Sequence, residues 1–229
     1  MTTTPSDGSD GGARAEILAR IRRALTDVPP NEPAIETEAV QRNYLQQHGT
    51  RTETQTIDLL AENLADYRAH VHRSDAAGLP TLVARLLKER ESDSVLIPAG
   101  LPAEWIAEAG VSRIDESPDR THADLDQVSS VVTGCALAIA ETGTIVLDSG
   151  PGQGTRRTTL IPDHHICVIR VPEQVVASVP QALPRLDPAR PQTWISGPSA
   201  TSDIELDRVE GVHGPRTLDV ILLSAQKSG

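Results

Sequence analysis

Apolar side chains in the first fifth of the chain follow helical spacing rather than strand spacing. Between residues 13 and 25 they fall on one helical face, and arginines occupy the other faces. Prolines at 29–33 then predict an extended linker, because proline cannot continue a helix. A second amphipathic helix is expected over 36–47. We therefore predict a disordered tail over residues 1–12, which offer almost nothing apolar to bury, and a helical arm over 13–48.

From residue 49 to residue 229, helix-spaced segments alternate with short apolar runs. Helices are expected over 57–69 and 79–89, and the short runs are expected to be strands. The expected strands cover 69–73, 94–98, 111–114, 128–134, 160–170, 193–196 and 217–223. This alternation predicts an α/β domain with an open, mostly parallel sheet flanked by helices. Sheets of this kind bind ligands at the carboxyl ends of their strands.

Two further features of the domain are a helix-spaced segment after residue 172 and a pair of histidines on the first expected strand. A helix is expected over 173–183, with Pro180 ending or kinking it. His70 and His72 lie two apart on a predicted strand and share one face, which is a spacing that can hold a metal. No acidic or cysteine ligands accompany them nearby, so a solvated sheet face is the favoured interpretation.

The segment Ala138–Asp148 consists of two apolar runs joined by a polar turn. β-Branched residues in the runs favour strands, and Gly143 in the turn reaches positive φ at little cost. The turn holds the carboxylate of Glu141 close to the core, where it is either tied down by donors or poised for chemistry. A hairpin whose Glu141 simply faces solvent is the other interpretation. Glu141 is our candidate catalytic residue, and its neighbours Thr142, Gly143 and Thr144 are candidates for ligand binding.

A glycine-rich segment over 149–157 ends in Arg156 and Arg157. It has neither the GxGxxG nor the GK[ST] pattern of nucleotide-binding loops. Guanidinium groups present planar forks to carboxylate or phosphate, so the segment is suited to an anion, with Arg157 as the candidate. The alternative is a mobile surface loop.

His164 and His165 stand at the start of a strongly apolar run. Adjacent residues on a strand face opposite sides, so only one of the two can share a site with Glu141. A histidine close to a carboxylate is suited to proton transfer, and His165 is the second catalytic candidate. A hydrogen-bonded structural histidine is the alternative.

Two polar segments near the C-terminus are rich in donors. The first, over 197–205, interrupts a predicted strand, although its S-x-x-E spacing can also start a helix. The second, over 211–215, carries two glycines that allow close backbone approach. The candidate ligand-binding residues here are Gly197, Pro198, Ser199, Thr201, Asp203, His213 and Gly214.

Composition excludes several classes of function. A formal net charge of −11 argues against nucleic acid or an anionic membrane as the main partner. Two cysteines far apart in sequence cannot form a CxxC pair or ligate an iron–sulfur cluster alone. No signal peptide or membrane span is evident, so we expect a cytoplasmic protein. The residues identify no cofactor, and His165 with His213 is the only set that suggests a metal.

Four motifs, taken together and in order, resemble the lactate-utilisation (LUD) domain family, and within it the C-type members. They cover residues 140–144, 160–166, 197–205 and 211–215, and the similarity runs from about residue 13 to the C-terminus. Ser202 departs from the alanine that the family commonly has there. The resemblance implies a fold similar to the NagB/RpiA/CoA-transferase group. It also implies a role in oxidising L-lactate to pyruvate together with iron–sulfur partner proteins.

The resemblance leaves three hypotheses open. In the first, the chain binds a small carboxylate or related cofactor through Arg156, Arg157 and the 197–203 segment, with Glu141 or His165 as the base and with partners carrying the electrons. In the second, Glu141 is a nucleophile resembling the glutamate of CoA-transferases. In the third, the chain is a scaffold whose helical arm docks the partner complex.

Overall fold

The computed structural model describes residues 10–24, 26, 45–201, 209–210 and 213–225. The chain divides into two units, Met1–Tyr44 and Leu45–Gly229. In the first unit, helix α1 (Asp10–Ala24) begins within the segment expected to be disordered. Most of the helix expected over 36–47 lies outside the described residues, and the described residues 45–47 are not helical.

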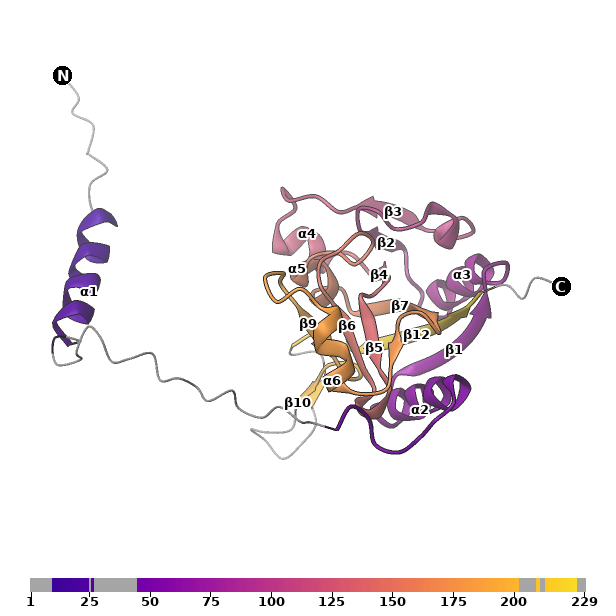
Figure 1. Cartoon of the computed structure of the whole chain (residues 1–229). Helices are drawn as coiled ribbons and strands as arrows, with labels where there is room; N and C mark the ends of the chain where they lie inside the picture. Colours follow the sequence, from indigo (N-terminus) through magenta and orange to yellow (C-terminus); the bar gives the residue numbers. More distant parts are fainter. Residues whose placement is uncertain (1–9, 25, 27–44, 202–208, 211–212, 226–229) are drawn as a thin grey trace, which may run out of the picture. The chain divides into compact units, whose positions relative to one another are not determined.

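Six parallel strands form the main sheet of the second unit (Figure 1). The strands, in spatial order, are β1 (His70–Asp75), β12 (Thr217–Ser224), β7 (His164–Val171), β4 (Ser130–Thr133), β2 (Ser94–Ile97) and β3 (Ser112–Asp115). The inner strands β12, β7, β4 and β2 are largely apolar and buried, as strands covered on both faces require, whereas the edge strands β1 and β3 are more polar and more exposed. His164 lies opposite Ser130 on one neighbouring strand and Thr217 on the other. The open, mostly parallel sheet predicted from the sequence is confirmed.

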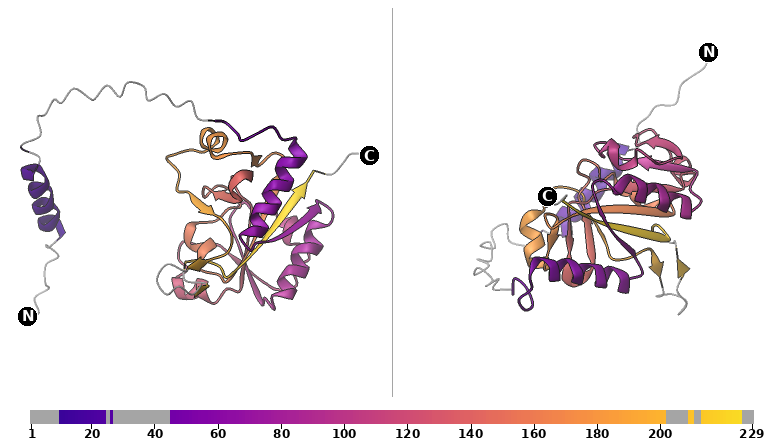
Figure 2. Two further views of the ribbon diagram at one scale, coloured as in Figure 1. Left: turned by 90° about the horizontal axis from the view of Figure 1, so that it is seen from below. Right: turned by 90° about the vertical axis from the view of Figure 1, so that its right-hand side faces the viewer.

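Helices cover both faces of this sheet, as the right-hand view of Figure 2 shows. On one face α3 (Leu79–Glu89) and η1 (Ala103–Ile106) pack on even-numbered residues of β7 such as Ile166 and Val168. On the other face α2 (Glu53–Asp66) packs on odd-numbered residues such as Cys167 and Ile169. The short helices α4 (His122–Asp126) and α5 (Arg156–Leu160) connect strands.

A second, four-stranded sheet lies over the face that α2 covers, and the sequence did not predict it. Its order is β8 (Val175–Val176), β5 (Leu137–Ile139), β6 (Thr144–Leu147) and β9 (Thr193–Ile195). The expected hairpin is confirmed as the antiparallel pair β5 and β6, joined by η2 (Ala140–Thr142). Ala138 and Ile145 of this hairpin share one apolar core with Leu60 and Leu64 of α2.

The helix predicted over 173–183 is wrong for most of its length. Val175–Val176 instead forms β8, which pairs in parallel with Ala138 and Ile139 of β5. Two β-branched residues fit that half-buried strand position better than a helix. Pro180 stands in the first turn of α6 (Val179–Ala182), where its missing N–H costs nothing, so it starts the helix rather than ending it. The remaining short elements are η3 (Leu183–Arg185), β10 (Ala200–Thr201) and β11 (Val209–Glu210).

Both cysteines are buried core thiols, as the sequence indicated. Cys135 and Cys167 lie side by side, and their mutual hydrogen bond, followed by burial, raises the pKa of the Cys135 thiol. None of the described helices is both long enough and apolar enough to cross a membrane.

Candidate functional site

A cavity of about 300 Å³ opens beside the edge strand β9 and is lined by residues of both sheets. Its floor includes His165 and Leu218, which are the second residues of β7 and β12. Its walls come from α5, from the segment that follows β9 and from the segment that precedes β12. The remaining lining residues are Arg156, Leu160, Gln192, Thr193, Trp194, Ile195, Ser196, Gly197, Pro198, Ser199, His213, Gly214 and Pro215.

This cavity lies at the amino ends of the parallel strands, the edge opposite to the one expected for an α/β sheet. The reason is the second sheet. Strand β9 pairs antiparallel with β6, and it carries the donor-rich segment 196–199 to the amino end of β7. The carboxyl-end rule applies to ligands placed by βα loops of a single sheet, and here the walls come from another sheet.

His165 is almost fully enclosed beneath the cavity, with 1% of its surface exposed. Its Nε2 atom lies 2.7 Å from the hydroxyl of Thr133 on β4. Burial, followed by the nearby charge of His164, lowers the pKa of His165 to about 3. The imidazole is therefore neutral at physiological pH, and so low a pKa makes it a weak general base.

His164 faces the other side of the sheet, so only one histidine of the pair reaches the cavity. Its Nε2 lies 3.0 Å from Asp219 and its Nδ1 lies 2.8 Å from the hydroxyl of Ser130. Asp219 also lies 2.6 Å from Nε2 of His72. Burial raises the pKa of Asp219, but the hydrogen bonds of the two histidines outweigh it and hold the pKa below its usual range.

The contact with Asp219 corrects the interpretation of His72 as part of a solvated face. This contact could not be predicted from the sequence, because 147 positions separate the two residues. Among the described residues, no group of three or more histidine, cysteine, aspartate or glutamate side chains is placed to hold a metal ion.

The two arginines at the start of α5 have different surroundings. Arg157 donates hydrogen bonds to the main-chain carbonyls of Ser117, Pro118 and Arg120, at 2.8–3.1 Å, and thereby holds that turn. Arg156 lines the cavity, and within the described part of the chain its guanidinium has no partner. A guanidinium next to a cavity is suited to a carboxylate or phosphate.

The glycine-rich loop before α5 is held by hydrogen bonds to the rest of the domain. Three of its amides already have acceptors in the protein: that of Gly150 bonds to Asp148, that of Gly152 to the carbonyl of Ala99, and that of Thr155 to Glu116. Buried backbone donors are usually satisfied in this way. The loop therefore anchors α5 and leaves Arg156 as its contribution to the cavity.

The two C-terminal polar segments meet at the cavity. The amide of Ser199 donates to the carbonyl of Pro215 at 2.8 Å, and the amide of His213 donates to the hydroxyl of Ser199 at 3.0 Å. Gly197, Pro198 and Gly214 line the same cavity. Thr201 belongs to β10, and Asp203 lies outside the described residues.

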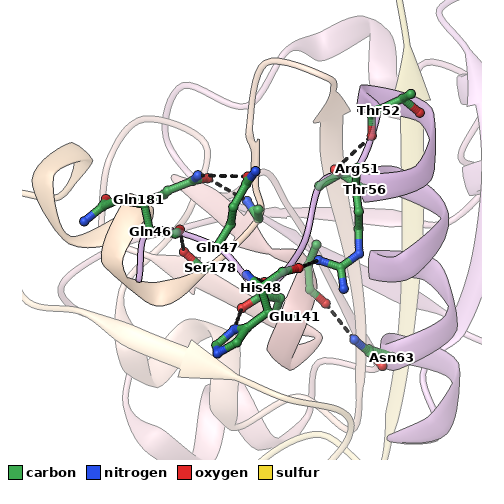
Figure 3. A network of polar contacts seen from close by, with 12 residues as sticks. Gln46, Gln47, His48, Arg51, Thr52, Thr56, Asn63, Glu141, Ser178 and Gln181 are labelled. Carbon is green, nitrogen blue, oxygen red and sulfur yellow. Dashed lines mark hydrogen bonds and ion pairs between the residues drawn. The ribbon is translucent and has the colours of Figure 1, made fainter. Parts of the chain in front are cut away.

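Glu141 lies at a different place, beneath the segment that precedes α2 (Figure 3). Its carboxylate accepts hydrogen bonds from the amide of His48 at 2.8 Å and from Arg51 at 3.4 Å, and it lies 3.0 Å from Nδ1 of His48. Burial raises the pKa of Glu141, but these contacts outweigh burial and the net effect is a lowered pKa. The carboxylate is tied down by donors and does not line the cavity.

The rest of the Glu141 turn packs against α2 and connects to the cavity only through hydroxyl groups. Gly143 has φ of 56°, and a Cβ atom there would lie 2.8 Å from the main chain of Asn63 in α2. The hydroxyls of Thr142 and Thr144 are 2.8 Å apart, and that of Thr144 is 2.8 Å from the hydroxyl of Ser196, a lining residue.

Several lining residues had no signal in the sequence. Thr193 and Ile195 belong to β9, which Gln192 directly precedes, and the position of that strand depends on the unexpected second sheet. Thr133, whose hydroxyl contacts His165, is the polar last residue of β4, a strand that also begins with the polar residue Ser130. A diagonal contact between neighbouring strands can be read only after their register is known.

Comparison with known proteins places the chain in a family. The model of the LUD domain matches residues 57–223. The chain belongs to the LUD domain family. A "Lactate utilization protein C" from Deinococcus radiodurans is 41% identical over 227 residues, covering 97% of this chain and 100% of that protein. A Bacillus subtilis protein of the same name is 33% identical over 129 residues, which cover 53% of this chain and 50% of that protein.

A solved structure supports the same assignment. The crystal structure of a "duf162 family protein" from Deinococcus radiodurans matches with a TM-score of 0.64 and 38% sequence identity. The match covers 76% of this chain and 99% of that one.

Proposed function

We propose that this LUD-family chain is a subunit of an L-lactate utilisation system and that its cavity binds the carboxylate of lactate or pyruvate. The observation that carries the proposal is the guanidinium of Arg156 at the wall of the cavity, which has no partner among the described residues. The names of the relatives, including that of the protein that is 41% identical, support the choice of ligand.

The other groups of the cavity complement such a ligand. A small hydroxy or oxo acid carries one more oxygen next to its carboxylate. His165 supplies a neutral imidazole for that oxygen, while Ser199 and His213 lie on the adjoining wall. A site with one positively charged side chain and a few neutral polar groups selects a small ligand for its negative charge and fixes its orientation.

Oxidation of lactate also requires an electron acceptor. The chain has two cysteines, fewer than the four thiolates that commonly hold an iron–sulfur cluster. We therefore propose that iron–sulfur partner proteins carry the electrons while this chain binds the small carboxylate, and that the assembly works in the cytoplasm.

Calorimetric titration of the full chain with L-lactate and with pyruvate tests the proposal. We expect binding of at least one of them, and we expect Arg156→Gln to weaken it at least tenfold through loss of a charge-assisted pair. The control is Arg85→Gln, which removes the same charge from an exposed position on α3 and should bind like the wild type. Absence of binding in the wild type would contradict the proposal.

Glu141→Gln separates this proposal from the CoA-transferase-like hypothesis. Because Glu141 lies outside the cavity and holds the segment at His48 and Arg51, we expect the variant to bind the carboxylate normally. We expect faster amide exchange at His48, where the charged acceptor is lost. Trapping of a hydroxylamine-sensitive thioester on Glu141 with an acyl-CoA would instead support the nucleophile hypothesis.

A further inference from the structure

We propose that Thr133 is a positioning residue that fixes His165 in its Nδ1–H tautomer, so that His165 presents a hydrogen-bond donor to the cavity. Thr133 is fully buried at the end of β4, and its hydroxyl lies 2.7 Å from Nε2 of His165. No other described residue bonds to that hydroxyl.

Which of the two groups donates this hydrogen bond follows from the single hydrogen of the Thr133 hydroxyl. A hydroxyl has one hydrogen, and burying that hydrogen without an acceptor costs free energy. If Nε2–H donated to Thr133, the hydroxyl hydrogen would have no acceptor among the described residues. Thr133 therefore donates to Nε2, which must carry a lone pair.

The other ring nitrogen then carries the proton of the neutral imidazole. No protein group among the described residues bonds to Nδ1, yet no buried side-chain nitrogen or oxygen in that part of the chain lacks a partner. Nδ1 is thus the nitrogen left to the cavity, which His165 lines. His165 therefore presents an N–H donor to the cavity and no lone pair that could act as a base.

His164 provides an internal comparison, because the same argument gives it the opposite tautomer. The ionised Asp219 can only accept, so Nε2 of His164 carries its proton. In the neutral ring, Nδ1 of His164 then accepts from Ser130, whose oxygen in turn lies 2.6 Å from the hydroxyl of Ser92. Two adjacent histidines are therefore held in opposite tautomers by partners on opposite faces of one sheet.

The tautomer defines the class of ligand oxygen that His165 binds, an inference that rests on the function proposed for the cavity. Arg156 and His165 both donate, so the ligand must supply acceptors to both. A 2-oxo acid has only acceptor oxygens, whereas the hydroxyl of a 2-hydroxy acid must also place its own hydrogen. We expect pyruvate to bind more tightly than L-lactate.

Nitrogen-15 NMR of the histidine side chains in the full chain tests the tautomer, with signals assigned through His165→Gln and His164→Gln. We expect Nδ1–H at His165 and Nε2–H at His164. Thr133→Val should shift His165 toward Nε2–H, and Thr133→Ser should restore the wild-type pattern. Ser130→Ala is the matched control, since it should perturb His164 and leave His165 unchanged.

An Nε2–H tautomer at His165 in the wild type would overturn the proposal, even if Thr133→Val failed to fold. So would an unchanged His165 spectrum in a folded Thr133→Val protein. In titrations with pyruvate we expect Thr133→Val to bind about tenfold more weakly and Thr133→Ser to bind like the wild type, as for loss of one buried hydrogen bond. If the wild type bound neither acid, the proposed function would fail, while the spectra would still decide the tautomer.

Discussion

At the residue scale, the chain buries two histidines next to each other and gives them different electrostatic surroundings. His164 shares the carboxylate of Asp219 with His72, whereas among the described residues the imidazole of His165 bonds only to the neutral hydroxyl of Thr133. A neutral partner does not offset the desolvation of a cation, so burial dominates the pKa of His165. This difference makes His165 a neutral donor and His164 part of a charged network.

The lowered pKa of His165 predicts a pH dependence of stability. An unfolded chain protonates this histidine below its ordinary pKa of 6.5, whereas the folded chain resists protonation until about pH 3. The unfolded state therefore binds more protons in this window, and the free energy of unfolding falls as pH falls from 6.5 toward 3. His165→Gln should reduce that slope by up to about 1.4 kcal/mol per pH unit.

Urea unfolding at pH 6.5, 5.5 and 4.5 measures this effect. Asp219 does not affect this comparison. Its folded-state pKa is lowered, so its contribution to stability is lost only as pH falls below the pKa of 3.8 that it has in the unfolded chain. Equal slopes in the wild type and in His165→Gln would show that His165 is not buried as a neutral group.

At the element scale, helix α2 organises the side of the domain next to the cavity. Its C-terminal end packs so closely on two turns that each requires glycine. A Cβ atom on Gly143 would lie 2.8 Å from the main chain of Asn63, and one on Gly197 would lie 2.2 Å from the carbonyl oxygen of Tyr67. Because Gly197 lies within the lining segment 196–199, the position of α2 helps to place the cavity wall.

Gly197→Ala should therefore lower the free energy of unfolding by more than the cost of placing alanine at a positive φ angle. Gly197 and Gly49 both have positive φ, at 80° and 73°, but a Cβ atom on Gly49 would meet nothing within 4 Å. Gly49→Ala should cost about 1 kcal/mol for the left-handed conformation. Gly197→Ala should cost about 1–3 kcal/mol more because of the overlap with Tyr67.

Chemical denaturation of the two variants measures the difference directly. Similar losses in both would mean that α2 shifts freely and does not constrain the segment after β9. The same experiment with carboxylate binding as the readout should show weaker binding for Gly197→Ala and normal binding for Gly49→Ala.

The hairpin of β5 and β6 was predictable from its local pattern, whereas the two-residue strand β8 was not. The hairpin of β5 and β6 carries its own pairing partner, so the pattern over 138–148 was sufficient. Val175–Val176 satisfies helical spacing locally, but its strand partner is β5, almost 40 residues earlier. Short segments of this kind take the conformation that their tertiary neighbours allow.

At the scale of the whole molecule, the chain consists of two units with a boundary at Tyr44. Residues after this boundary belong to the folded domain. Ser178 donates to the carbonyl of Gln46, and the amide of His48 donates to Glu141, as Figure 3 shows. A deletion that extends to residue 48, as the arm predicted from the sequence would suggest, removes these contacts as well.

Deletion of residues 1–44 provides the cleaner test of the arm. We expect the shortened chain to keep its thermal midpoint within a few degrees and to bind carboxylate like the full chain, since the cavity lies wholly in the second unit. If the arm docks partner proteins, the shortened chain should lose co-purification with them. A large loss of stability would show that the first unit packs on the second.

The sequence by itself determined the class of fold, the alternation of strands and helices that implies a parallel sheet, the hairpin around Glu141 and the family. It also identified both C-terminal segments of the cavity, because turn residues and donors are local features of a chain. Only the tertiary structure decided that Glu141 holds the segment before α2, that Arg156 rather than Arg157 faces the cavity, and that Thr133 supports His165. Each of these depends on which strands lie side by side, and strand neighbours are chosen by burial of the whole core rather than by any one segment.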